Sequence, residues 1–254
     1  MKTPLTLLLL LIGIPAVGSG PQARPSVDAH VSRDSVQIME DLFFLASDEL
    51  EGRAMGSPGA ARARDRIVEG FQAAGVGPPQ GTEMVQPFEA RRRSRPGSPA
   101  DGTLGGANVA GWVPGTSPDA GLMVITAHYD HVGVRNGQVY NGADDNASGT
   151  AALLSIARYL ANAPLRQDVL LVALDGEERG LLGADALLSA DWLEVDRIAL
   201  NVNLDMVSRS DSVLFAAGAY HSPAVGPILE DVARDAPVAL RLGHDAPGLP
   251  GVDD

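Results

Sequence analysis

Three short stretches of the chain are apolar at most positions: residues 122–127 (LMVITA), 169–174 (VLLVAL) and 198–204 (IALNVNL). Continuous apolar runs of this length are typical of strands that are buried on both faces of a sheet. Between them, residues 147–162 and 180–190 carry apolar side chains at helical spacing. This alternation predicts an α/β fold, with a helix–sheet–helix sandwich around a mainly parallel central sheet.

The segments before and after these runs predict further elements. Residues 34–47 have apolar side chains at helical spacing, and Ser57 followed by Pro58 predicts the start of a second helix, which Gly75 ends. Residues 91–106 are rich in Gly, Pro and Ser, which predicts a surface loop and not a domain boundary. Strands are also expected at 84–90 and 213–217, and a helix at 222–236.

The first 18 residues have the pattern of a secretory signal peptide. Lys2 provides a positive start, an apolar stretch follows, and Ala16-Val17-Gly18 offers small residues for cleavage. The stretch is short for a membrane span and contains Pro15, although an uncleaved anchor is the alternative. We therefore predict an exported protein, periplasmic or secreted, with no membrane association after cleavage of residues 1–18.

Composition narrows the possible partners. The formal net charge of −13 argues against nucleic acid, because phosphate binding needs the opposite sign. The chain has 0 cysteines, so disulfides are excluded and any metal must be held by nitrogen and oxygen ligands.

Polar and acidic motifs follow the apolar runs, at the point where each predicted strand ends. They are His128-Tyr129-Asp130, Asp144-Asp145-Asn146, Glu177-Glu178 and Asp205. Sites in α/β sheets form at the carboxyl ends of parallel strands, so we expect these motifs to meet. Taken alone, each motif also has an explanation without a metal. The first could be a polar strand end and the second a helix cap. The glutamate pair could be the solvated start of a helix, and Asp205 could begin a turn.

Together the motifs allow metal chemistry. His128 and Asp130 leave the same face of a strand, and a metal-binding histidine usually gives its second ring N–H to a carboxylate. One carboxylate, such as that of Asp144, can bridge two cations. The adjacent Glu177 and Glu178 could divide the roles of general base and metal ligand, because a base must not be fully engaged by metal.

The order of these motifs resembles that of peptidase family M28, the zinc aminopeptidases. The resemblance covers the chain from about residue 34 to residue 205. The stretch 45–53 (LASDELEGR) is similar to the family's N-terminal segment. The resemblance implies a metal-dependent aminopeptidase that acts on peptides with a free N-terminus. It assigns one zinc to His128, Asp144 and Asp205, and a second to Asp144, Glu178 and a later histidine. It also implies that Glu177 is the general base and that Asp130 and Asp145 contact the ligands without binding the metal. A cis peptide is implied between Asp144 and Asp145.

The chain departs from the family pattern after Asp205. The family's last ligand is a histidine in a Ser-Asp-His-like element, which does not occur here; His221 and His244 stand in other settings, and His30 and His131 are interpreted as surface or loop residues. We therefore interpret residues 34–254 as a single domain that is incomplete at its C-terminus. Two zinc ions are expected in a complete family member, but one or fewer in this chain, with impaired turnover.

Two alternatives stay open at this point. A glutaminyl-cyclase-like enzyme shares the fold and a Gly-Glu-Glu segment, but it uses one zinc. A non-catalytic binding protein of the same fold would tolerate the missing histidine. The sequence does not specify the preferred N-terminal residue, the oligomeric state or the physiological metal.

Overall fold

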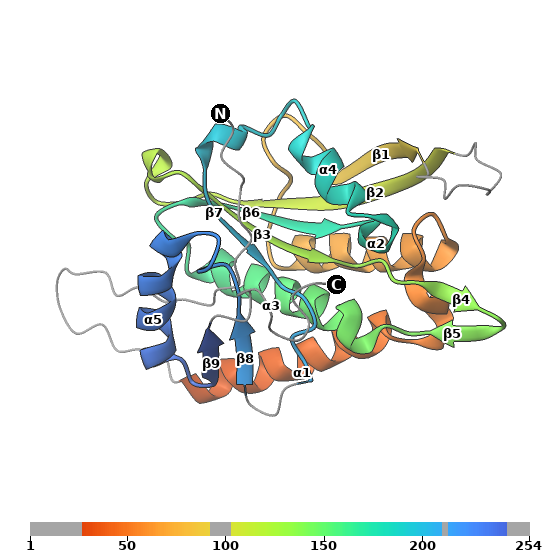
Figure 1. The fold of residues 1–254 in the computed structure, drawn as a ribbon, viewed down its shortest axis with the longest axis horizontal. Helices are drawn as coiled ribbons and strands as arrows, with labels where there is room; N and C mark the ends of the chain where they lie inside the picture. The colour runs from red at the N-terminus through yellow and green to blue at the C-terminus, as the bar shows by residue number, and fades with distance from the viewer. Residues whose placement is uncertain (1–26, 92–102, 210–212, 243–254) are drawn as a thin grey trace.

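The computed structural model describes residues 27–91, 103–209 and 213–242 (Figure 1). Its central sheet has five strands in the order β1-β2-β6-β3-β7. Their bounds are Val85–Arg91, Thr103–Val113, Asp168–Leu174, Leu122–His128 and Ile198–Asn203, respectively. β1 pairs with β2 and β2 with β6 in antiparallel fashion, whereas β3 is parallel to both β6 and β7. The strands that precede the acidic motifs are therefore mutually parallel, as predicted.

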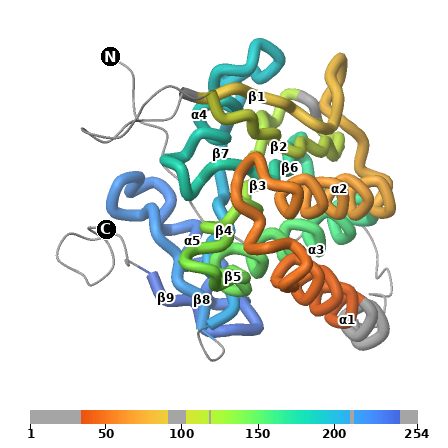
Figure 2. Tube along the Cα trace, turned by 90° about the vertical axis from the view of Figure 1, so that its right-hand side faces the viewer, coloured from red at the N-terminus to blue at the C-terminus, as the bar shows by residue number. Residues whose placement is uncertain are grey.

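Helices cover both faces of the sheet. The helices α1 (Val27–Leu45), α2 (Pro58–Ala73) and α3 (Gly149–Asn162) lie on one face, and α4 (Leu182–Leu188) lies on the other (Figure 1). Figure 2 shows α1, α2 and α3 next to one another beside the sheet, where α3 contacts both α1 and α2. The predicted sandwich is confirmed, and the predicted helix start at Ser57 is capped, since Ser57 Oγ accepts a hydrogen bond from the Ala60 N–H at 3.1 Å.

Strand β6 shows why the apolar runs predicted buried strands. All of its residues are buried. Val169, Leu171 and Ala173 pack into the core beneath α2 and α3. The intervening residues Leu170, Val172 and Leu174 pack into the second core, which includes Leu187 of α4. Because successive side chains point to opposite faces, a strand covered on both sides needs an apolar residue at every position.

A small hairpin was not predicted. The strands β4 (Gly133–Arg135) and β5 (Gln138–Tyr140) pair in antiparallel fashion. Their turn is Asn136-Gly137, and both residues have positive φ, at 52° and 76°. Asn-Gly favours this turn, so the sequence did contain the signal.

The C-terminal described part forms a separate two-stranded parallel sheet. It consists of β8 (Val213–Ala216) and β9 (Ala239–Leu242), with α5 (Gly226–Asp235) between them in the chain. The predicted signal peptide and His244 lie outside the described residues, as do the side chain of His30 and residues 92–102 of the predicted loop 91–106. The prediction of a loop was wrong for residues 103–106, which begin β2. Among the helices that the structure describes, none has both the length and the apolar character to cross a bilayer.

Candidate metal centre

The ends of three parallel strands and one loop bring the predicted residues together. His128 is the last residue of β3, Glu177 and Glu178 follow β6, and Asp205 follows β7. Residues 142–148 reach the same edge immediately before α3. This arrangement confirms that the motifs converge at the carboxyl edge of the sheet.

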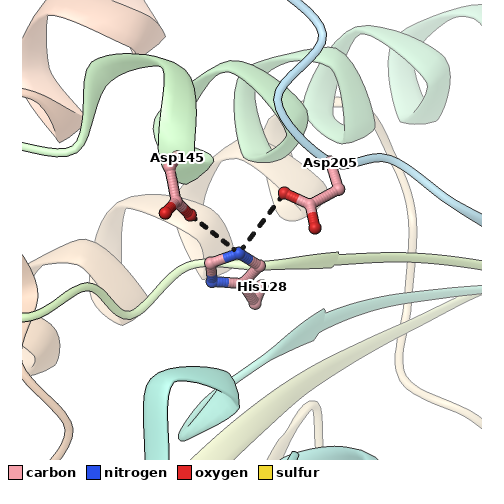
Figure 3. Close-up of side chains that lie close together, drawn as sticks. All are labelled: His128, Asp145 and Asp205. Atoms are coloured by element: carbon pink, nitrogen blue, oxygen red, sulfur yellow. Dashed lines mark ion pairs between the residues drawn. The ribbon is translucent and has the colours of Figure 1, made fainter. Parts of the chain in front are cut away.

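His128, Asp145 and Asp205 form the first group of candidate ligands (Figure 3). The Nε2 atom of His128 lies 3.2 Å from Asp145 Oδ1 and 3.6 Å from Asp205 Oδ1. Burial alone lowers the pKa of His128, but the carboxylates of Asp130, Asp145 and Asp205 outweigh it and raise the pKa to about 12. The two carboxylates beside Nε2 thus require a positive charge there, which a proton or a metal ion can supply.

Asp145 faces a second group with its other oxygen. Asp145 Oδ2 lies 3.8 Å from His131 Nδ1, and that nitrogen lies 2.6 Å from Glu178 Oε1. The hydrogen bond with His128, opposed by burial, lowers the pKa of Asp145, so this carboxylate is ionised at neutral pH. The carboxylate of Asp145 therefore lies between His128 and His131, and each of these histidines also lies close to another acidic residue.

The predicted bridging residue Asp144 points elsewhere. Its Oδ1 accepts hydrogen bonds from the Ser208 N–H at 3.1 Å and the Ser208 hydroxyl at 2.6 Å. Asp144 belongs to neither group of candidate ligands found among the described residues. Asp145, and not Asp144, thus lies between the two groups of candidate ligands.

The hydrogen bonds of Asn146 explain the direction of the Asp145 side chain. The cis peptide lies between Asp145 and Asn146, one position later than the resemblance implied. Asn146 is fully buried, donates to the Leu204 carbonyl at 2.8 Å and accepts from the Gly149 N–H at 3.0 Å. Since Asn146 is tied to the end of β7, the preceding carboxylate is directed toward His128.

Asp130 lies next to His128 and to the turn that carries Glu177 and Glu178. Its carboxylate is fully buried, and Oδ1 lies 3.6 Å from His128 Nδ1. It also accepts hydrogen bonds from the backbone N–H groups of Glu177 at 3.0 Å and Glu178 at 3.3 Å. Asp130 therefore fixes the turn that carries both glutamates relative to the end of β3.

Glu177 has the properties of a general base. Burial, together with the charges of Asp130, Glu178 and Asp205, raises its pKa, while His128 opposes the shift. Glu177 forms no ion pair with any residue in the described part of the chain. A carboxylate that is unpaired and has a raised pKa is a stronger base than a free carboxylate.

Arg53 was not recognised from the sequence as part of the site. Its guanidinium is fully buried and donates to the carbonyls of Tyr129 at 2.8 Å, Asn141 at 2.7 Å and Gly142 at 2.9 Å, and also to Leu45. Burial lowers the pKa of Arg53 to about 10, against the opposing charges of Asp130 and Asp145. One buried cation thus joins the two loops that carry the candidate ligands.

The donor set suits zinc. Imidazole nitrogen and carboxylate oxygen are both zinc ligands, and catalytic zinc sites combine them in threes with an open fourth position. Two buried atoms at the site, His131 Nδ1 and Glu178 Oε1, have no hydrogen-bond partner in the described structure. They form an ion pair with one another at 2.6 Å, so the fit to zinc rests on the types of donor atom.

Curated proteins of other organisms are similar in sequence to this chain. The alkaline phosphatase isozyme conversion protein of Escherichia coli is 28% identical over 205 residues, covering 76% of this chain and 56% of that protein. A probable zinc metalloprotease of Leptosphaeria maculans is 35% identical over 108 residues, covering 41% of this chain and 25% of that protein. The chain thus spans little more than half of the length of the first relative and a quarter of the second.

Solved structures share the fold. A leucine aminopeptidase precursor from Bacteroides thetaiotaomicron has a TM-score of 0.60 at 16% identity, over 84% of this chain and 76% of that one. A glutaminyl cyclase of Porphyromonas gingivalis has a TM-score of 0.61 at 20% identity, over 80% of this chain and 71% of that one. At these identities the likeness concerns the fold alone.

The histidine–carboxylate groups and the similarity to a probable zinc metalloprotease support a hydrolase of the zinc metallopeptidase class. The model of peptidase family M28 matches residues 108–243, which contain every candidate ligand described above. The chain belongs to peptidase family M28.

Proposed function

We propose that this protein is a zinc-dependent aminopeptidase that removes N-terminal residues from peptides. The observation that carries this proposal is the position of Asp145, whose two oxygens face His128 on one side and His131 with Glu178 on the other. A carboxylate between two ligand groups is the arrangement that two-metal hydrolases use.

The roles of the residues follow from their positions. His128, Asp145 and Asp205 would hold one zinc ion, and Glu178 would contribute on the other side of Asp145. When bound, zinc polarises a carbonyl group and acidifies water. Glu177 accepts the proton of the attacking water and later gives it to the leaving amine. Asp130 holds Glu177 in place through the hydrogen bond to its backbone N–H.

The charge of the site supports an exopeptidase. Asp205, Glu177 and Glu178 bring carboxylates to the same edge of the sheet as the candidate ligands, and the chain as a whole carries a net charge of −13. A peptide's free α-amino group is a cation, so it is attracted to such a site. Substrates are therefore proposed to be peptides with a free N-terminus.

Hydrolysis of aminoacyl-p-nitroanilides by the purified chain, with and without a zinc chelator, tests the proposal. We expect chelator-sensitive hydrolysis that added zinc restores. Glu177→Gln should lose at least about 100-fold in kcat, because the base is removed. Glu194→Gln is the matched control, since Glu194 is 71% exposed and pairs only at the surface with Arg197. Equal activity of both variants would contradict the role of Glu177.

Two further assays separate the alternatives. Release of a cyclised N-terminal glutaminyl peptide, without free amino acid, would identify a glutaminyl-cyclase-like enzyme. Absence of bound zinc in the purified chain, together with absence of hydrolysis, would instead favour a binding protein of the same fold.

Export is proposed on the sequence of residues 1–18 alone. Mass spectrometry of the protein recovered from the producing cells tests it. A mature N-terminus at about residue 19 supports export, and an intact Met1 in the cytoplasmic fraction contradicts it.

A further inference from the structure

The turn between β6 and α4 carries the two glutamates of the site, and it begins where β6 separates from β2. The paired residues of these two strands end at Val109 and Ala173. Beyond that pair, side chains make the contacts. Asp175 Oδ2 accepts a hydrogen bond from the Ala107 N–H at 3.0 Å, and Asn108 Oδ1 accepts one from the Asp175 N–H at 3.0 Å. The start of the turn is thus held by the side chain of Asn108.

The same side chain also reaches the other end of the turn. Asn108 Nδ2 donates a hydrogen bond to the carbonyl of Gly183, in the first turn of α4, at 2.8 Å. The two ends lie close together, since a Cβ atom on Gly183 would come within 2.2 Å of the Asp175 carbonyl oxygen and 2.5 Å of Asn108 Oδ1. One amide group therefore holds residues 175 and 183, and the glutamates lie between them.

The turn depends on contacts of this kind for its shape. Gly176, Gly180 and Leu181 have φ values of 72°, 105° and 62°. Such a φ is unfavourable for leucine, and it persists where the surrounding structure imposes it. Asn108 is 1% exposed and Asp175 is 2% exposed, so water does not replace the amide. Loss of the Asn108 side chain would leave a buried N–H and the Gly183 carbonyl without this partner, and a shift of the turn would follow.

Asn108 acts on the turn together with Asp130. The carboxylate of Asp130 accepts hydrogen bonds from the N–H groups of Glu177 and Glu178, in the middle of the turn, at 3.0 Å and 3.3 Å. Asp130 thus holds the middle of the turn, and Asn108 holds both of its ends. The backbone that carries the Glu177 carboxylate is therefore fixed from two different strands of the sheet.

We propose that Asn108 is a positioning residue for Glu177, because it holds both ends of the turn that carries this base. The inference rests on the proposed function and extends it to a residue of β2 that is not among the candidate ligands. Asn108 itself takes no part in proton transfer. Its contribution is to keep the Glu177 carboxylate where it can accept the proton of the attacking water.

Hydrolysis of an aminoacyl-p-nitroanilide by Asn108→Ala tests the proposal. The variant should lose about 10–100-fold in kcat, because a small misplacement of a catalytic group is costly, while KM should stay within about 3-fold of the wild type. Leu160→Ala is the matched control. It also removes a buried side chain, but near the C-terminal end of α3, whereas the site lies before the N-terminal end of that helix. This control should keep the wild-type kcat, provided that both variants are assayed where they are folded.

A double variant separates positioning from general damage to the fold. In Glu177→Gln the base is already absent, so the addition of Asn108→Ala should lower kcat by no more than about 2-fold. Changes that act through the same group are not additive, whereas independent damage is. A full additional loss in the double variant would overturn the proposal, and so would an unchanged kcat in Asn108→Ala alone.

Hydrogen exchange followed by mass spectrometry tests the same contact without any assay of activity. Asn108→Ala should speed exchange in the peptide that covers residues 176–183 by at least about 10-fold, because local opening of the turn becomes easier. In Leu160→Ala the peptide that contains residue 160 should exchange faster instead. Unchanged exchange at 176–183 would overturn the role of Asn108 and leave the proposed function standing. Absence of chelator-sensitive hydrolysis in the wild type would overturn the proposed function, and with it the role of Asn108 in catalysis, whatever the exchange shows.

Discussion

Asp145 and His128 approach one another to 3.2 Å, whereas the carboxylate of Asp144, the preceding residue, is hydrogen-bonded to Ser208. Two adjacent aspartates of identical chemistry thus have different surroundings. This difference yields the most direct test of which residue bridges the metal positions.

Asp145→Asn should abolish tight zinc binding, because a neutral amide replaces the charged oxygens on both sides of the residue. Asp144→Asn is the matched control, and it should leave zinc affinity within about 3-fold of the wild type, since an amide oxygen can still accept from Ser208. Isothermal titration with zinc measures both. The opposite ranking of the two variants would return the bridging role to Asp144.

Asp130→Asn should weaken zinc binding by about 10–100-fold, as expected for a residue that orients ligands. The amide retains one acceptor oxygen, so one of the two N–H groups of Glu177 and Glu178 loses its partner. Asp196→Asn, at an exposed position, serves as the control. Equal zinc affinity and equal kcat in both variants would show that Asp130 does not hold the glutamate turn.

Arg53→Lys should destabilise the fold by about 2–4 kcal/mol, because lysine keeps the charge but cannot reach several carbonyls at once. Unfolding by urea measures the change, and Arg62→Lys is the control, since Arg62 is 49% exposed. If the two variants have the same free energy of unfolding, the carbonyl contacts of Arg53 contribute little.

Asp175 should make stability depend on pH. Burial, with a smaller contribution from the Asp130 charge, raises its pKa to about 6, against hydrogen bonds from the Ala107 N–H and others. Because the folded pKa lies above the unfolded value of about 3.9, the folded state binds the proton more tightly. The associated stability is fully present below pH 4 and is lost as the pH rises through 6.

Asp175→Asn removes this titration. Between pH 4 and pH 7.5, the wild type should lose on the order of 2–3 kcal/mol more stability than the variant. Urea unfolding at the two pH values measures the difference, with Asp191→Asn as the exposed control. Parallel losses in the wild type and in Asp175→Asn would contradict the raised pKa.

The sequence predicted β3, β6 and β7 because each is a nearly continuous apolar run, but it did not predict β2 (Thr103–Val113), whose apolar residues are interrupted by glycines and an asparagine. Val169 to Leu174 are apolar at every position, and both faces of β6 are indeed covered. The turn at Asn136-Gly137 also had a local signal, which was not used. For these elements, the pattern of apolar and turn-forming residues in the sequence is enough to predict the secondary structure.

The ligands were harder to assign because their directions are set by distant contacts. Asp145 is directed toward His128 because Asn146 binds the carbonyl of Leu204, 58 positions away in the sequence. His131 faces Glu178 because Gly142 leaves room for its ring. Neither contact has a signature in the spacing of residues near the histidine or the aspartate, so the sequence indicated where the motifs meet but not which side chains face one another.

Asp145 lies between the two groups of candidate ligands, so a cation bound by one group is expected to affect the other. A cation held by one oxygen of Asp145 would fix the rotamer of this carboxylate and so orient its other oxygen toward the second group. Substitution of a residue in one of the two groups would then also alter how the other group binds a cation.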